Sequence, residues 1–244
     1  ARIVRVDGDY DDSVTEAARL ASENDWYVVS DTSYPGYEII PRDVMQGYGT
    51  IAAEVIEQAT EPFTHVFLQS GVGGLAAGLA SYFWEYYGAA RPRLISVEPK
   101  QADCLYQSAL QGHASQASGD VSSLMAGLAC GKASPLAWQI ISLAVDDFLT
   151  IGDDEAVSAM RFLAAGSERD IPVVAGESGA AGLAGLLSIA RSPAYSASIG
   201  LGTKSRVLLI NTEGATAPLV YQQLVNQSAE CVVERQIHWL TTNS

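Results

Sequence analysis

One segment has the residue types and spacing of an anion-binding turn. The apolar run His65–Gln69 is followed by Ser70, then by Gly71, Val72, Gly73 and Gly74, and then by a helix-length apolar stretch. Where a strand passes through glycines into a helix, backbone N–H groups and the positive end of the helix dipole converge. A side chain in such a turn would keep the backbone away from a phosphate. The spacing favours a phosphate cradle, although a tight turn without a ligand would have the same pattern.

Two further polar residues follow expected strands. Asp31 comes after the apolar run Trp26–Ser30 and opens a polar segment that contains Tyr34 and Tyr37. A carboxylate that is partly desolvated by aromatic rings is suited to proton abstraction. Thr212 lies just beyond another apolar run. Both positions are also typical of turn or capping residues, so the pattern alone leaves their roles open.

The surrounding elements predict an α/β fold with a doubly wound, mostly parallel sheet and flanking helices, because short apolar runs alternate with helix-length amphipathic stretches. Asp11, Asp12 and Ser13 resemble N-cap residues of the first helix. Strands are expected at Ile3–Val6, Trp26–Ser30, His65–Gln69, Arg93–Val97, Asp147–Ile151 and Arg206–Asn211, helices at Ser13–Glu23, Arg42–Gln58, Leu75–Tyr87, Ala102–Gln111, Ser134–Ala144, Asp153–Ala165, Gly179–Ala190 and Pro218–Asn226, and surface loops at Gly112–Gly119 and Pro193–Ser205.

Composition limits the classes of partner. The 244 residues are 48% hydrophobic and 17% charged, with a formal net charge of −14, which disfavours nucleic acids and anionic membranes as partners. There is no apolar run of about 18 residues and no secretory signal pattern. Cys104, Cys130 and Cys231 form no CxxC pair, so we expect a cytoplasmic, metal-free protein in which the first two are buried free thiols.

Several motifs, in the same order, resemble the diaminopropionate ammonia-lyase family of fold-type II pyridoxal-phosphate enzymes, the tryptophan synthase β and threonine dehydratase group. The glycine-rich turn resembles the phosphate loop of that group. The resemblance extends over roughly residues 1–225. The other segments that carry it are 31–38 with Pro41, 45–48, 97–99, 102–106, 125–130, 176–180 and 210–214.

The resemblance implies pyridoxal 5'-phosphate as cofactor and α,β-elimination of 2,3-diaminopropionate to pyruvate and ammonia. It implies that Gly71–Gly74 hold the phosphate, that Thr212 faces the pyridine nitrogen, and that Asp31 takes the α-proton of the L-isomer. Glu177 could also face the ring, with a capping or surface role as the alternative. The resemblance also implies a small amino-acid substrate and a homodimer. It divides the chain into the remainder of a small domain (1–50), a large cofactor-binding α/β domain (51–226) and a C-terminal tail (227–244).

The family's Schiff-base lysine has no counterpart here. Lys100, Lys132 and Lys204 are the only lysines, and none lies in a segment like the one that carries that lysine. The chain also begins at Ala1 inside an expected strand, so an N-terminal segment that would carry the lysine is expected to be missing. Two alternatives stay open: another type II lyase such as a threonine or serine dehydratase, or a catalytically inert remnant. The Asp31–Tyr37 segment favours the diaminopropionate lyase over the dehydratases.

Overall fold

A parallel four-stranded sheet forms the centre of the computed structural model, which describes residues 2–243. The strand order is β3-β2-β1-β4, and every pairing is parallel. His65 at the start of β1 pairs with Arg93 on one side and with Val207 on the other. The strands are β1 (His65–Gln69), β2 (Arg93–Pro99), β3 (Asp147–Ile151) and β4 (Val207–Leu209).

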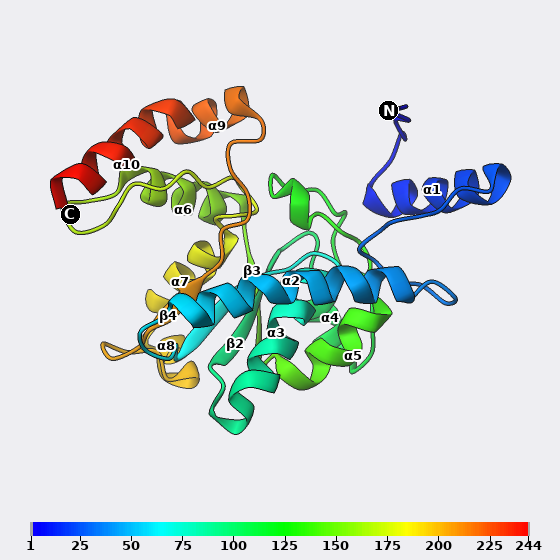
Figure 1. Ribbon diagram of the computed structural model, residues 1–244, viewed down its shortest axis with the longest axis horizontal. Coiled ribbons are helices and arrows are strands. Elements are labelled where there is room, and N and C mark those ends of the chain that lie inside the picture. The colour runs from blue at the N-terminus through cyan, green and yellow to red at the C-terminus, as the bar shows by residue number, and fades with distance from the viewer. Residues whose placement is uncertain (1, 244) are drawn as a thin grey trace.

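Helices cover both faces of this sheet (Figure 1). One face is covered by α3, which packs on α2 and α5, and the other by α7, which packs on α6 and α8. The helices are α1 (Tyr10–Asn24), α2 (Ile39–Gln58), α3 (Gly74–Tyr87), α4 (Cys104–Gln111), α5 (Pro135–Ala144), α6 (Asp153–Ala165), α7 (Ala181–Ala190), α8 (Pro193–Ile199), α9 (Pro218–Val225) and α10 (Ala229–Asn243), with 3-10 turns at Gly88–Ala90 and Ala126–Leu128.

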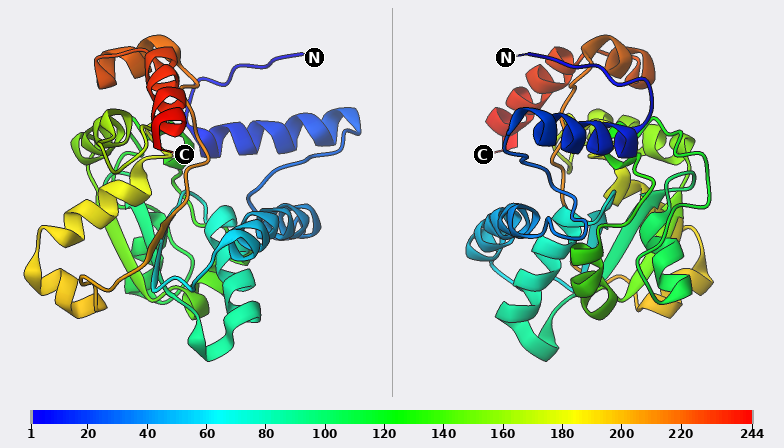
Figure 2. Two further views of the ribbon diagram at one scale, coloured as in Figure 1. Left: turned by 60° about the vertical axis from the view of Figure 1, so that its left-hand side comes forward. Right: turned by 90° about the vertical axis from the view of Figure 1, so that its right-hand side faces the viewer.

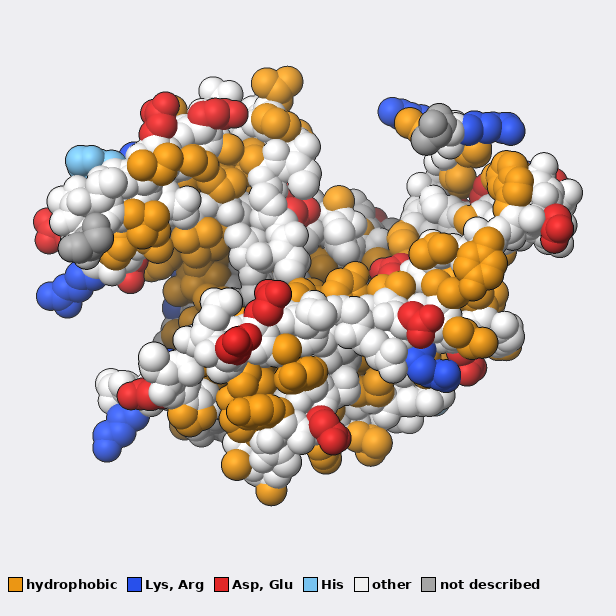
Figure 3. Space-filling model, in the orientation of Figure 1, with side chains coloured by type: hydrophobic (Ala, Val, Ile, Leu, Met, Phe, Trp, Pro, Cys, Tyr) orange, Lys and Arg blue, Asp and Glu red, His pale blue; other side chains and the backbone are white. Residues whose placement is uncertain are grey.

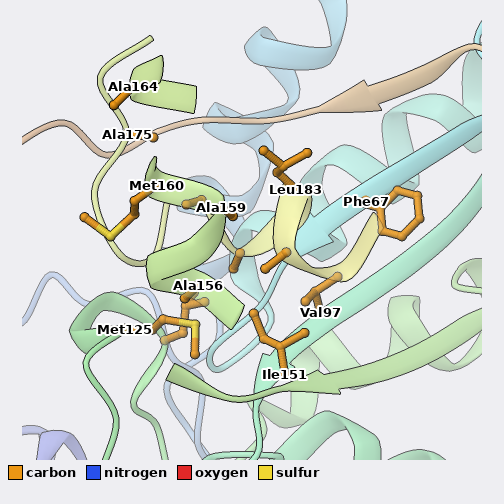
Figure 4. Close-up of a cluster of buried hydrophobic side chains, with 14 of the residues drawn as sticks. Phe67, Val97, Met125, Ile151, Ala156, Ala159, Met160, Ala164, Ala175 and Leu183 are labelled. Carbon is orange, nitrogen blue, oxygen red and sulfur yellow. The ribbon is translucent and has the colours of Figure 1, made fainter. Parts of the chain in front are cut away.

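Alternation along the buried strands creates two hydrophobic cores. Phe67 and Val97 point to the α7 face, where they join Met160 and Leu183 (Figure 4). Residues of opposite parity, such as Leu68, point to the α3 face. Successive strand side chains point to opposite faces, so both faces of a covered sheet need apolar residues. This explains why β1 has apolar residues at the consecutive positions Val66, Phe67 and Leu68.

The sequence located the sheet and most helices correctly. The strands at 65–69 and 147–151 and the helix at 153–165 have the expected bounds, and the other expected helices differ by a few residues at their ends. The strand expected at Arg206–Asn211 shrinks to Val207–Leu209. The first helix is capped by Asp9 rather than by Asp11–Ser13, because the Asp9 carboxylate accepts the Asp12 N–H at 3.0 Å.

Two expected strands are absent from residues 2–243. Ile3–Val6 and Trp26–Ser30 have no strand conformation, and their apolar side chains are exposed: Ile3 by 86% and Tyr27 by 78%. An extended segment becomes a strand only when a neighbour accepts and donates its backbone hydrogen bonds. No described segment does so here, and α1 with its connection to α2 projects beside the sheet (Figure 2).

The C-terminal region contains more helix than the sequence predicted. The loop expected at Pro193–Ser205 instead begins with α8, which starts at a proline after the N-cap Ser192. The tail forms α10, in which Val232 is fully buried and the Arg235 guanidinium donates to carbonyls at the end of α6. Gly112–Gly119 is a loop as expected. Within residues 2–243, no helix combines the length and apolarity that crossing a membrane requires.

Candidate functional site

A cavity of about 480 Å³ opens at the carboxyl ends of β1 and β4. The chain passes from β1 to β2 on one side and returns to β4 on the other, and ligands of open α/β sheets bind at such a switch point. On this side the molecule is notched between α9–α10 and α1 (Figure 3). The cavity is lined by Tyr10, Asp31, Tyr48, Gln69–Ala76, Ala126–Leu128, Cys130, Ser178, Thr212 and Glu213.

The turn between β1 and α3 presents free backbone donors to this cavity. Gly73 caps α3 with a φ of 103° and supplies no side-chain hydrogen bond. Among residues 2–243, the N–H groups of Gly71, Gly73 and Gly74 have no hydrogen-bond partner, whereas the Val72 carbonyl accepts the Ser134 N–H at 2.9 Å. The first turn of α3 also carries no acidic side chain. These features make the predicted cradle a site of positive potential that lacks an anion-mimicking group of its own.

The sequence suggested that a side chain at position 73 would block the approach of a phosphate, but in the structure it would clash with α5. A Cβ at Gly73 would lie 2.8 Å from Ile141 Cδ1 and 3.1 Å from Ala137 Cβ, both on α5. It would therefore enter the hydrophobic core rather than the cavity. At Gly74 a Cβ would make only ordinary contacts, the nearest at 3.5 Å from the Asp31 carbonyl oxygen.

Polar groups from β1 and from the segment after β4 meet opposite the cradle. Gln69 is buried, and its Nε2 donates to Thr212 Oγ1 at 3.2 Å. Its Oε1 has no hydrogen-bond partner among the described residues. Glu213 Oε2 accepts the N–H groups of Ser178 and Gly179 at 2.6 and 3.1 Å. The structure thus places Thr212 on the wall of the cavity, three residues beyond the last residue of β4.

Asp31 lies on the wall of the same cavity, with two tyrosines that the sequence reasoning missed. The Tyr10 hydroxyl donates to Asp31 Oδ1 at 2.5 Å, and Tyr48 lines the wall nearby. Burial, followed by the hydrogen bond to Asp31, raises the pKa of Tyr10 above its usual value. Burial and the Asp31 charge also raise the pKa of Tyr48. The Tyr37 hydroxyl instead accepts the Ser30 N–H and donates to the Val28 carbonyl. The side chain that was expected to desolvate Asp31 therefore stabilises the segment that precedes Asp31.

Behind the cradle lies a buried acidic and thiol cluster. Cys104 and Cys130 are free and buried, as predicted. Burial raises the pKa of the Cys130 thiol to about 12. The buried Glu98 carboxylate accepts the N–H groups of Leu105 and Tyr106 at 2.8 and 2.7 Å, and desolvation raises its pKa to about 8. This cluster anchors the start of α4 against the sheet.

The remaining candidates lie elsewhere. None of Lys100, Lys132 and Lys204 lines the cavity, and Lys100 forms an ion pair with Glu155 at 3.4 Å. Glu177 is not among the lining residues either. Across residues 2–243 no group of histidine, cysteine and carboxylate side chains is arranged to hold a metal ion.

Comparison with known proteins identifies relatives over almost the whole chain. The family model described as "Pyridoxal-phosphate dependent enzyme" matches residues 1–213. Diaminopropionate ammonia-lyase of Escherichia coli K12 is 37% identical over 238 residues, which are 95% of this chain and 60% of that protein. The Salmonella typhimurium enzyme is 41% identical over 90% of this chain and 57% of its own length. The chain therefore spans about 57–60% of the length of these relatives.

A solved structure shares the fold. The Escherichia coli diaminopropionate ammonia lyase in complex with D-serine superposes with a TM-score of 0.83 at 37% identity. The superposition covers 90% of this chain and 56% of that one. The expected fold-type II architecture is thereby confirmed.

Proposed function

Because this chain belongs to the family of pyridoxal-phosphate-dependent enzymes, we propose that the cavity holds pyridoxal 5'-phosphate and serves α,β-elimination of 2,3-diaminopropionate. The supporting observation is the set of unpartnered N–H groups of Gly71, Gly73 and Gly74 at the start of α3, inside the cavity. Identity of 37–41% to diaminopropionate ammonia-lyases directs the choice of substrate. The overall reaction takes one water and gives pyruvate and two ammonia molecules.

The residues present fit the cofactor. Its phosphate is a dianion, and the cradle provides backbone donors at the N-terminus of α3, whose first turn carries no carboxylate. Its ring nitrogen requires a polar partner across the cavity, and Thr212 provides a hydroxyl there. A volume of about 480 Å³ lies within the range that small-molecule sites occupy. Gly71–Gly74 and Thr212 would thus hold the two ends of the group.

Asp31 is the proposed base. When bound, the cofactor acidifies the α-hydrogen of an attached amino acid by withdrawing electrons from the α-carbon. The Asp31 carboxylate would take this proton from the L-isomer. The Tyr10 hydroxyl binds Oδ1, so it orients the carboxylate and leaves the second oxygen for the proton. Tyr48 lines the cavity wall on the same side.

Asp31→Asn in the full-length gene product tests the assignment. Loss of a positioned base costs about 100- to 10,000-fold in rate, so we expect kcat/KM for L-2,3-diaminopropionate to fall by that factor while cofactor content stays normal. Asp43→Asn, on the exposed side of α2, is the control and should retain activity. An unchanged kcat/KM in the Asp31 variant would remove Asp31 from the mechanism.

The same assay separates rival substrates. Comparison of L- and D-2,3-diaminopropionate with L-serine and L-threonine, by pyruvate or 2-oxobutyrate release, distinguishes the proposed lyase from a dehydratase. Preference for L-threonine would overturn the proposed substrate, and no turnover of any of them would favour the inert remnant.

We also propose that the protein is a cytoplasmic homodimer. We further propose the domain division that the resemblance implies: the remainder of a small domain at 1–50, a large cofactor-binding domain at 51–226 and a C-terminal tail at 227–244. The free state of Cys104 and Cys130 supports a reducing compartment. Sedimentation of the purified protein measures the oligomeric state.

A further inference from the structure

Gln69 has a buried amide group with one end unpaired. The residue ends β1, its side chain is 3% exposed, and its Oε1 is one of two buried side-chain atoms in residues 2–243 without a hydrogen-bond partner. The other is the hydroxyl of Tyr221, a residue that does not line the cavity. Buried polar atoms are nearly always paired, so an unpaired one on a cavity wall indicates a place for a ligand or a water.

The paired end of the amide has a defined direction. Gln69 Nε2 can only donate, and it donates to Thr212 Oγ1. The oxygen of Thr212 therefore acts as acceptor in this contact, and the threonine proton is left for another partner. Because Thr212 lines the cavity, that partner is a ligand atom that accepts a hydrogen bond.

The neighbouring polar side chains make other contacts, and none of those contacts is with Thr212. Glu213 Oε2 is occupied by two backbone N–H groups at the turn before α7. Ser178 Oγ accepts the Gly127 N–H at 3.0 Å and so supports the loop that covers the cradle. Gln69 is thus the side chain that sets the orientation of the Thr212 hydroxyl.

On the basis of the proposed function, we infer that Gln69 is a positioning residue: it fixes Thr212 as a hydrogen-bond donor to the ring nitrogen of the cofactor, and so keeps that nitrogen unprotonated. Had the amide pointed its oxygen at Thr212, the hydroxyl proton would be used by Gln69, and Thr212 could only accept a proton from a protonated ring. The protonation state of the ring nitrogen therefore shows which end of the Gln69 amide group faces Thr212.

The measurement is the nitrogen-15 chemical shift of pyridoxal 5'-phosphate labelled at the ring nitrogen and bound to the protein. We expect the shift of an unprotonated nitrogen between pH 6 and 9. Gln69→Glu replaces the amide donor by a carboxylate acceptor of the same shape. The Thr212 hydroxyl should then donate its proton to the carboxylate, and its oxygen can only accept a hydrogen bond from a protonated ring nitrogen. A protonated ring in the wild-type protein, or an unchanged shift in a folded Gln69→Glu variant with an ionised carboxylate, would overturn the inference.

A second measurement does not depend on the folding of the charged variant. Gln69→Met and Thr212→Val should each weaken cofactor binding by roughly three- to tenfold, the effect of one net hydrogen bond. Because both substitutions remove the same contact, their effects should not add. The double variant should bind the cofactor at most about twofold more weakly than whichever single variant has the lower affinity. Gln139→Met, on the exposed side of α5, is the matched control and should bind normally.

The outcomes separate the two claims. Additive losses in the double variant would show that Gln69 acts independently of Thr212 and would overturn the inference while the cofactor site stands. Failure of the wild-type protein to bind pyridoxal 5'-phosphate would instead refute the proposed function.

Discussion

Substitution of Gly73 by alanine tests the link between the cradle and the hydrophobic core. Gly73 has a φ of 103°, and an added Cβ would lie 2.8 Å from Ile141 Cδ1 and 3.1 Å from Ala137 Cβ. Real Cβ atoms essentially never lie within 3.0 Å of another heavy atom, so the end of the Ile141 side chain must shift, and the Ala137 Cβ on α5 must give by a few tenths of an ångström. The strain adds to the cost of a positive φ in a residue with a side chain.

The expected destabilisation follows from these two contributions. A left-handed backbone conformation costs a non-glycine residue about 1–2 kcal/mol. Overpacking a core by one methyl group costs about 1–3 kcal/mol. Gly73→Ala should therefore lower the free energy of unfolding by about 2–5 kcal/mol. Gly74→Ala is the matched control, because its Cβ meets no atom closer than 3.5 Å and alanine favours a helix.

Urea unfolding at 25 °C measures both variants, and a third change isolates the steric part. Ile141→Val removes Cδ1, so Gly73→Ala should cost about 1 kcal/mol less in that background than in the wild-type protein. A Gly73→Ala variant within about 0.5 kcal/mol of Gly74→Ala would refute the reasoning, since surface-like changes have effects of that size. An equal cost in both backgrounds would assign the whole effect to the backbone.

Three further outcomes are expected. Burial raises the pKa of Glu98 from 4.5 to about 8, so the folded state holds that proton more tightly than the unfolded state, and stability falls as the pH rises between these values. Glu98→Gln should abolish this fall, and an unchanged pH profile of urea unfolding would contradict it. Asp31→Asn should lower the pKa of Tyr10, measured by ultraviolet titration of the phenol, because it removes the charge next to the hydroxyl; an unaltered titration would refute the contact. Arg235→Met removes donors to the carbonyls at the end of α6, so hydrogen exchange should quicken across α10, and equal protection would show that the guanidinium does not hold the helix in place.

Sequence patterns were sufficient for the parts of the fold that are buried on two sides. The run His65–Gln69 is buried throughout because helices cover both faces of the sheet, so its apolar centre predicts its conformation. The runs Ile3–Val6 and Trp26–Ser30 are also mostly apolar, but they have no neighbouring strand among the described residues. Strand formation depends on a partner, and this information is absent from the run itself.

The candidate site shows the same division. The glycine-rich turn follows from local chemistry, because spacing between a strand and a helix predicts where N–H groups point. Tyr10 and Gln69 were missed, since each acts through a contact with a residue more than 20 positions away along the chain. Gln69 is the polar last residue of the buried strand β1. A polar residue at the end of a buried strand is therefore the sequence feature that could have identified Gln69 as a candidate site residue.

The central claim is that the turn at the start of α3 binds the phosphate of pyridoxal 5'-phosphate. Equilibrium dialysis of the protein against pyridoxal 5'-phosphate and against pyridoxal tests it, because the two ligands differ only in the phosphate. Charge-assisted hydrogen bonds contribute about 1.5–3 kcal/mol each, so we predict one saturable site that binds the phosphorylated ligand at least about tenfold more tightly. Equal affinity for the two ligands, or no binding of either, would contradict the claim.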